Sequence, residues 1–170
     1  ILHANYHLSP TENLIGYAYW YDTNGDKFAV TGSASSMDLS NRTLGLRLDG
    51  GHPINNEWKV LYTAEYAKQQ HISNGNSNID AHYYKLGLGG SWNGWFARFD
   101  QELLSSNDGK YGFYTPLGTN HLFQGWIDKF AASTPVEGMR DNYITAGGKW
   151  QDLTFLTEYH RFDSDKGFTS

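Results

Sequence analysis

Asp100 and Glu102 lie two positions apart in the stretch WFARFDQEL and form a carboxylate pair whose spacing could suggest chemistry. Paired carboxylates hydrolyse glycosidic bonds when one acts as a general acid and the other as a nucleophile or base. Alternate residues of a strand face the same side, and Arg98 shares that side with both carboxylates. A solvated ladder of charges is therefore the interpretation that we favour over a pair of catalytic acids.

The segment DTNGD, from Asp22 to Asp26, resembles the start of a calcium-binding loop, in which alternate oxygens surround a hard cation. No bidentate glutamate follows at the required distance, and Asn-Gly is the ordinary dipeptide of a tight turn. The chain has no cysteine, and HExxH, GxSxG, Walker and GxGxxG motifs are absent. The sequence therefore predicts no catalytic residue, no metal site and no cofactor.

The composition limits the class of protein. Lysine and arginine do not cluster into the stripe that a nucleic-acid surface needs, so nucleic acid is not expected as a partner. No continuous apolar run is long enough for a membrane-spanning helix. Aromatic residues reach 16%, and 19 glycines stand against 4 prolines, which is typical of a β-rich chain of one domain.

Alternation of apolar and polar residues predicts about eight strands. It is clearest in Trp58–Ala67, in RTLGLRLDG and in WFARFDQEL, where the charges of each segment fall on one face apart from Arg42 at the start of the second. Five further segments fit the same pattern: Leu2–Leu8, Leu14–Tyr21, Ala81–Leu88, Asn142–Lys149 and Leu153–Phe162. These segments approach the nine to eleven residues with which a tilted strand crosses a bilayer.

Short and long connections alternate along the chain. SPTEN, GGHPINNE, GGSWNG and the region around Trp150 are short, whereas the intervening connections are long. Outer-membrane barrels have this asymmetry, with short periplasmic turns and long external loops. The pattern predicts an all-β, antiparallel up-and-down transmembrane barrel. Since the strands would then begin and end outside, we expect the chain to be an internal portion of a larger barrel.

A soluble β-sandwich that binds carbohydrate is the alternative, because the aromatic excess could form a sugar-binding platform. In a barrel the same aromatic residues would form girdles at the membrane interfaces. Trp58, Trp92 and Trp150 all lie next to short connections, which favours the barrel. An enzyme built on a barrel has no nucleophile motif to support it.

The longest connection, Leu104–Gly138, contains the segment TNHLFQGWIDKF. Its apolar residues recur at helical spacing, which predicts a short amphipathic helix. In a barrel the apolar stripe of this helix would pack on the inner wall, so we expect the loop to fold into the lumen; a helix that caps the mouth is the alternative.

The inward faces of the strands then supply most candidate pore-lining residues, and the polar side of the helix supplies two more. The candidates are Arg47, Lys59, Glu65, Lys85, Arg98, Asp100, Glu102 and Glu158 from strands, with Asp128 and Lys129 from the helix. Wall charges of both signs predict weak selectivity. The expected function is passive diffusion of small polar or charged solutes.

Four segments in order, YTAEYAKQ, FYTPLGTNHLFQGWIDKF, RDNYITAGGK and EYHRFDSD, resemble the C-terminal half of bacterial outer-membrane porins of the alginate-export-like family. The resemblance implies a barrel of roughly sixteen to eighteen strands in the bacterial outer membrane, surrounded by lipid. Assembly into a homo-oligomer is left open by the sequence. The first strands, the last strands and the aromatic C-terminal residue of a full member are missing. Alginate is not expected as a substrate. Export of a polyanion would need a strongly cationic lumen, whereas the candidate pore-lining residues have charges of both signs.

Overall fold

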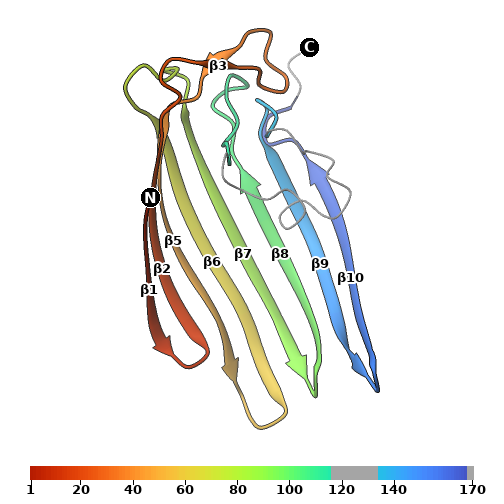
Figure 1. The fold of residues 1–170 in the computed structure, drawn as a ribbon. Coiled ribbons are helices and arrows are strands. Elements are labelled where there is room, and N and C mark those ends of the chain that lie inside the picture. Colours follow the sequence, from red (N-terminus) through yellow and green to blue (C-terminus); the bar gives the residue numbers. More distant parts are fainter. Residues whose placement is uncertain (116–133, 168–170) are drawn as a thin grey trace.

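A computed structural model describes residues 1–115 and 134–167 of the chain. Eight long strands form one antiparallel sheet, with neighbours in the order β1-β2-β5-β6-β7-β8-β9-β10 (Figure 1). Their bounds are β1 Leu2–Ser9, β2 Glu12–Tyr21, β5 Asn41–Pro53, β6 Trp58–His71, β7 Asp80–Trp92, β8 Trp95–Leu104, β9 Met139–Trp150 and β10 Leu153–Asp163. The prediction of an all-β fold with about eight antiparallel strands is confirmed.

The sheet is open, because β1 and β10 form its two edges and do not pair with each other. The eight described strands therefore do not close into a barrel. The helix expected within residues 119–130 lies outside the described residues, and the described part of the chain contains no helix. No described helix is long and apolar enough to cross a membrane.

The structure extends several predicted strands and adds two. His52 and Pro53 belong to β5, and β7 continues to Trp92, so both neighbouring turns are tighter than the sequence indicated. Asn93 and Gly94 both have positive φ angles, of 46° and 84°, which match the right-handed twist of a hairpin. In the connection between β2 and β5, β3 Lys27–Phe28 and β4 Met37–Asp38 form a small separate hairpin that was not predicted.

The strand register gives the sheet two chemically different faces. One face, called the polar face below, carries Arg47, Glu65, Lys85 and Glu102, which are register partners along consecutive strands. The other, called the apolar face, carries the alternate residues, such as Leu46, Tyr66 and Leu86. Because the side-chain period of a strand is two, this unbroken register fixes the face of every residue between them.

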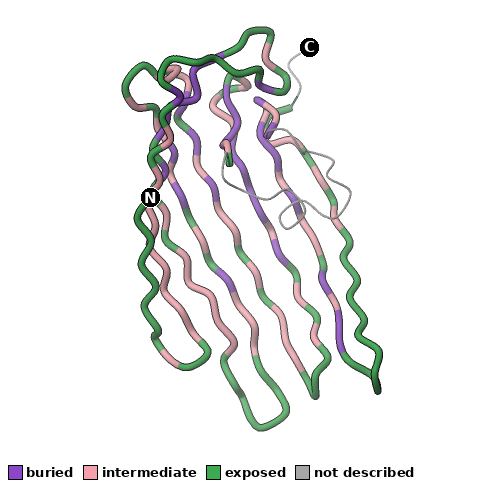
Figure 2. The backbone as a smooth tube through the Cα atoms, in the orientation of Figure 1, coloured by how far each residue is buried: buried purple, intermediate pink, exposed green. Residues whose placement is uncertain are grey.

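All long connections lie at one end of the sheet and the short turns at the other (Figure 1). At the long-connection end, described residues of the β2–β5, β6–β7 and β8–β9 connections pack against strand residues and form the buried core. Many of the buried positions in Figure 2 lie toward this end. The most buried members of the core are Ala67, Ile79, Ala81, Leu104, Tyr111, Met139 and Leu39. The core thus joins the described part of the longest connection to the wall of the sheet.

Candidate functional site on the polar face

The polar face holds every strand residue that the sequence nominated as pore-lining. Arg47 lies in β5, Lys59 and Glu65 in β6, Lys85 in β7, Arg98, Asp100 and Glu102 in β8, and Glu158 in β10. Asp128 and Lys129 lie outside the described residues. Five strands place Arg47, Glu65, Lys85, Glu102 and Asp141 side by side in register, so charges alternate until Glu102 meets Asp141.

An extended network of ion pairs and hydrogen bonds begins on β2 and β5. Arg47 lies 3.1 Å from Asp49 and 3.7 Å from Glu65, measured from its guanidinium nitrogens to the carboxylate oxygens. The hydroxyl of Tyr17 donates a hydrogen bond to Glu65 at 2.7 Å. Glu65 is therefore held by a cation from one strand and by a phenol from the strand beyond it.

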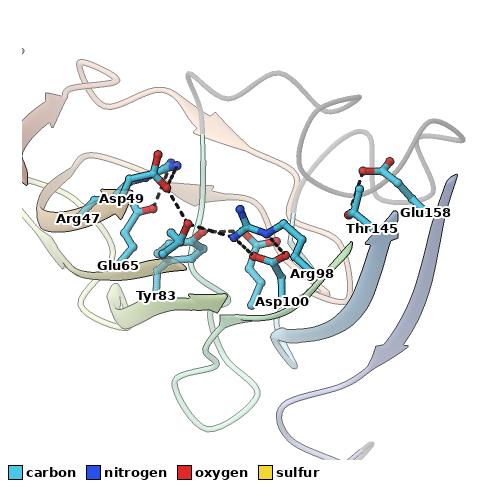
Figure 3. A network of polar contacts seen from close by, with 10 residues as sticks. Arg47, Asp49, Glu65, Tyr83, Arg98, Asp100, Thr145 and Glu158 are labelled. Carbon is cyan, nitrogen blue, oxygen red and sulfur yellow. Dashed lines mark hydrogen bonds and ion pairs between the residues drawn. The ribbon is translucent and has the colours of Figure 1, made fainter. Parts of the chain in front are cut away.

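The same network continues across β6 to β8, as Figure 3 shows from close by. Arg98 donates two hydrogen bonds to Asp100, each 2.6 Å long, from Nε and Nη2. Its Nη2 also donates to the hydroxyl of Thr63 at 3.1 Å, and Thr63 donates to Asp49 at 2.6 Å. Charge-assisted bonds of this bidentate kind fix the orientation of a guanidinium. Both arginines are thus already neutralised by neighbouring carboxylates.

Two glycines make these long-range contacts possible. Thr63 in β6 and Asp100 in β8 are both register partners of Gly87 in β7, so the Arg98–Thr63 bond passes over that glycine. A Cβ atom at Gly87 would collide with the guanidinium of Arg98 and with Asp100. Gly45 plays the same part in β5, because the ring of Tyr17 lies over it on the way to Glu65. Glycine in a strand often marks such a close approach.

A second group of carboxylates is buried where the polar face meets the loop core. Glu102 is 2% exposed and Asp141 is 0% exposed, and the two are direct register partners. Tyr83 donates a hydrogen bond to Glu102 at 2.6 Å, and Nδ1 of His160 lies 2.8 Å from Asp141. One oxygen of each carboxylate has no protein partner among the described residues. Glu102, a candidate pore-lining residue, is therefore covered in the structure.

The remaining candidates are more exposed. Glu158 is an exposed residue on edge strand β10 and accepts a 3.5 Å hydrogen bond from Thr145. Lys59 is exposed near the short turn after β5. The ammonium group of Lys85 lies 5.5 Å from the centre of the Tyr143 ring, which is cation–π distance.

Gln69 fastens the first part of the longest connection to the polar face. Its carbonyl oxygen accepts hydrogen bonds from the Tyr111 hydroxyl at 2.6 Å and from the Tyr114 backbone amide at 2.9 Å. Its amide nitrogen donates to the Tyr114 carbonyl, and also to Asn41 and Thr43. The hydrogen-bonding capacity of this buried side chain is therefore well used.

The sequence analysis did not identify Tyr17, Thr63, Gln69 or the two glycines. Tyr17 and Thr63 do fall on the polar alternate positions of their strands, which is a signal that could have found them. Gln69 and Gly87 gain their importance from residues of other strands and loops. Their contacts depend on register, which a single sequence does not determine.

The apolar face is bare of charge over the middle of the sheet. Large exposed side chains cover it, including Leu44, Leu46, Leu86, Leu88, Phe99, Ile144, Phe155 and Tyr159. The charged residues of this face stand at strand ends: Glu12 beside a short turn, and Arg42, Lys68, Asp80, Arg140, Arg161 and Asp163 toward the long connections. Trp58 stacks on Trp92 with ring centres 5.9 Å apart, and Trp95 on Phe155 at 6.3 Å, near the short turns.

Within the described residues, no group of three or more histidines and carboxylates could hold a metal ion. Comparisons with protein-family models, with curated proteins and with solved structures found no match.

Proposed function

We propose that this chain forms part of a bacterial outer-membrane β-barrel and works as a porin-like channel for passive diffusion of small polar or charged solutes. The observation that carries the proposal is the separation of the two faces. Ion pairs and buried carboxylates occupy one face, while the other exposes aliphatic and aromatic side chains with charges only at the strand ends. In a transmembrane barrel these faces become the lumen wall and the lipid-facing wall.

The dimensions of the apolar face support contact with lipid. On β6 it runs from Trp58 to Tyr66, about 26 Å along the strand at 3.3 Å per residue. A strand tilt of about 35–45° reduces this to a height of about 19–22 Å, most of the expected band. Outer-membrane barrels have an apolar band about 25 Å tall, bordered by aromatic girdles. The stacked tryptophans beside the short turns fit one such girdle.

A closed channel needs partners for β1 and β10, because unpaired backbone groups are not tolerated in hydrocarbon. β1 runs toward the short-turn end and β10 runs away from it, so a further antiparallel strand at either edge would continue the same meander. The resemblance to alginate-export-like porins favours roughly sixteen to eighteen strands in all, in the range of water-filled barrels. Further strands of a longer polypeptide or an assembly of copies would both provide them.

A β-sandwich is less consistent with the fold. A sandwich buries the apolar face of one sheet against a second sheet. In the described residues the only other sheet is the two-stranded β3–β4 hairpin, and the apolar face is exposed. No observation favours the carbohydrate-binding alternative over the channel.

The experiment that tests the proposal combines membrane fractionation with electrical recording in planar bilayers. The native polypeptide should be recovered from the outer membrane only with detergent and should open stepwise, ohmic channels. Recovery of a monodisperse soluble protein, or the absence of conductance from folded protein, would contradict the proposal.

Two neighbouring residues of β10 provide a matched pair of variants. Phe155 is 47% exposed on the apolar face, and Leu156 is 56% exposed on the polar face. Phe155→Arg should hinder membrane assembly, because an arginine facing lipid costs from about 0–1 kcal/mol near an interface to about 2–4 kcal/mol at the bilayer midplane. Leu156→Arg should assemble normally, and equal damage from both changes would argue against a lipid-facing and a water-facing side.

A further inference from the structure

We propose that Gly87 is a positioning residue that sets the ion preference and free width of the channel, by leaving room on the polar face for the Arg98 guanidinium. The inference rests on the channel function proposed above and deepens it. It concerns the charge that a solute meets at this level of the wall.

The register explains why this position matters. Gly87 lies directly between Thr63 in β6 and Asp100 in β8. Arg98 binds both of these residues, so its guanidinium must cross the backbone of β7 at Gly87. In this arrangement the cation lies against the wall with a carboxylate and a hydroxyl around it. A solute therefore meets a compensated ion pair at this point.

A methyl group at position 87 would occupy the space in which the Arg98 guanidinium lies. The two nearest side-chain atoms are Nη2 of Arg98 and Oδ1 of Asp100, and both lie well inside van der Waals contact of an added Cβ atom. The Asp100 side chain is short and 1% exposed, whereas that of Arg98 is long and 22% exposed. Arg98 therefore has the greater freedom to move and can leave the wall, whereas the Asp100 carboxylate can only turn where it stands.

The displaced guanidinium has two effects on permeation. It loses its close pairing with Asp100, so the lumen gains a cation at this level. It also stands out from the wall, which narrows the passage. Rings of charged side chains set the ion preference of pores in this manner. Gly87→Ala should therefore lower the single-channel conductance and shift the preference toward anions.

The test is recording in planar bilayers with the full native polypeptide, using a KCl gradient to obtain the reversal potential. The control is Gly90→Ala in the same strand, because Gly90 lies on the apolar face and an added Cβ atom there makes only ordinary contact. Gly87→Ala should reduce conductance and move the reversal potential in the anion-selective direction. Gly90→Ala should leave both unchanged.

The double variant Gly87→Ala/Arg98→Ala separates this role from a general effect on the strand. Removing the displaced side chain should restore the conductance and reverse the shift, leaving Asp100 to favour cations. If Gly87→Ala alone fails to insert, the double variant should insert, because Arg98 is gone and the Asp100 carboxylate, no longer held by it, can turn away from the added methyl group.

An unchanged reversal potential in folded Gly87→Ala, or a double variant that behaves like Gly87→Ala, would overturn the inference. So would failure of both variants to insert while Gly90→Ala inserts. These outcomes differ from failure of the proposed function, in which the unmodified protein itself forms no channel.

Discussion

The carbonyl oxygen of the Gln69 side chain accepts a 2.6 Å hydrogen bond from the Tyr111 hydroxyl, and through it the longest connection is joined to the sheet. Both side chains are buried, Gln69 at 1% and Tyr111 at 0% exposure. A buried polar group that loses its partner costs more than the bond itself contributes. The contact is therefore a sensitive point for the position of the loop.

Gln69→Leu should loosen the loop while the sheet remains intact. The change leaves the buried Tyr111 hydroxyl and the partly buried Tyr114 amide without their acceptor, and a buried group left unsatisfied costs about 1–3 kcal/mol. We expect faster proteolytic cleavage between residues 105 and 115, and a higher or noisier conductance. Tyr111→Phe is the milder comparison, because Gln69 keeps its bond to the Tyr114 amide. Equal protection of the loop in Gln69→Leu and the unmodified protein would contradict this role.

Gly45→Ala should weaken the link between β2 and β6. An added Cβ atom would overlap the Tyr17 ring, so the hydrogen bond from Tyr17 to Glu65 would be lost. Overpacking of this kind costs about 1–3 kcal/mol. Gly16→Ala in neighbouring β2 is the control, since nothing lies within 4 Å of its added Cβ atom. Urea unfolding of the detergent-folded protein should separate the two variants, and a similar midpoint for both would show that the crossing is unimportant.

The stability of the connection that contains β3 and β4 should depend on pH, because it depends on the charge of Asp38. Hydrogen bonds from Ser40 and Thr23 lower the pKa of the Asp38 carboxyl below its usual range. A lowered pKa in the folded state stabilises the fold above the unfolded pKa, and this contribution is lost as pH falls through the folded value. Asp38→Asn should therefore speed hydrogen exchange of the Ser40 amide at neutral pH, with the difference shrinking in strong acid. A difference that persists below the folded pKa would contradict the assignment.

Arg98→Lys should disturb the network more than the retained charge suggests. Lysine cannot reproduce the two parallel bonds that Arg98 makes to Asp100 together with the bond to Thr63. We expect a more mobile cation in the lumen and larger current noise in bilayer recordings. Lys59→Arg is the comparison, because Lys59 is exposed near a short turn, and it should leave the noise unchanged.

Much of the fold followed from the alternation of residues. Trp58, Val60, Tyr62, Ala64 and Tyr66 were expected on one face of a strand, and β6 places them so. The strand ends were less accurate, because His52 and Pro53 look like turn residues and are recruited to β5 by pairing with Val60 and Lys59. The β3–β4 hairpin has too few residues for a periodic signal.

The candidate site, too, was predictable from the sequence only in part. The side on which Arg47, Glu65 and Arg98 lie depends on the period of each strand, so the sequence could predict it. The state of those charges depends on partners in other strands. Arg98 reaches Thr63 only because Gly87 stands between them, and Glu102 is covered by a core formed with the loop. Such contacts can be predicted only when the strand register and the path of the loop are known, and the alternation of residues determines neither.

Each long strand pairs only with the strands that precede and follow it in the sheet, and within the described residues only the β2–β5 connection contains further strands. Contacts that are close in sequence form quickly, since little loop entropy opposes them. Assembly can therefore advance one hairpin at a time, with each completed hairpin serving as the template for the next. At every stage the outermost strand is the growing end, and β1 and β10 have that character in the structure.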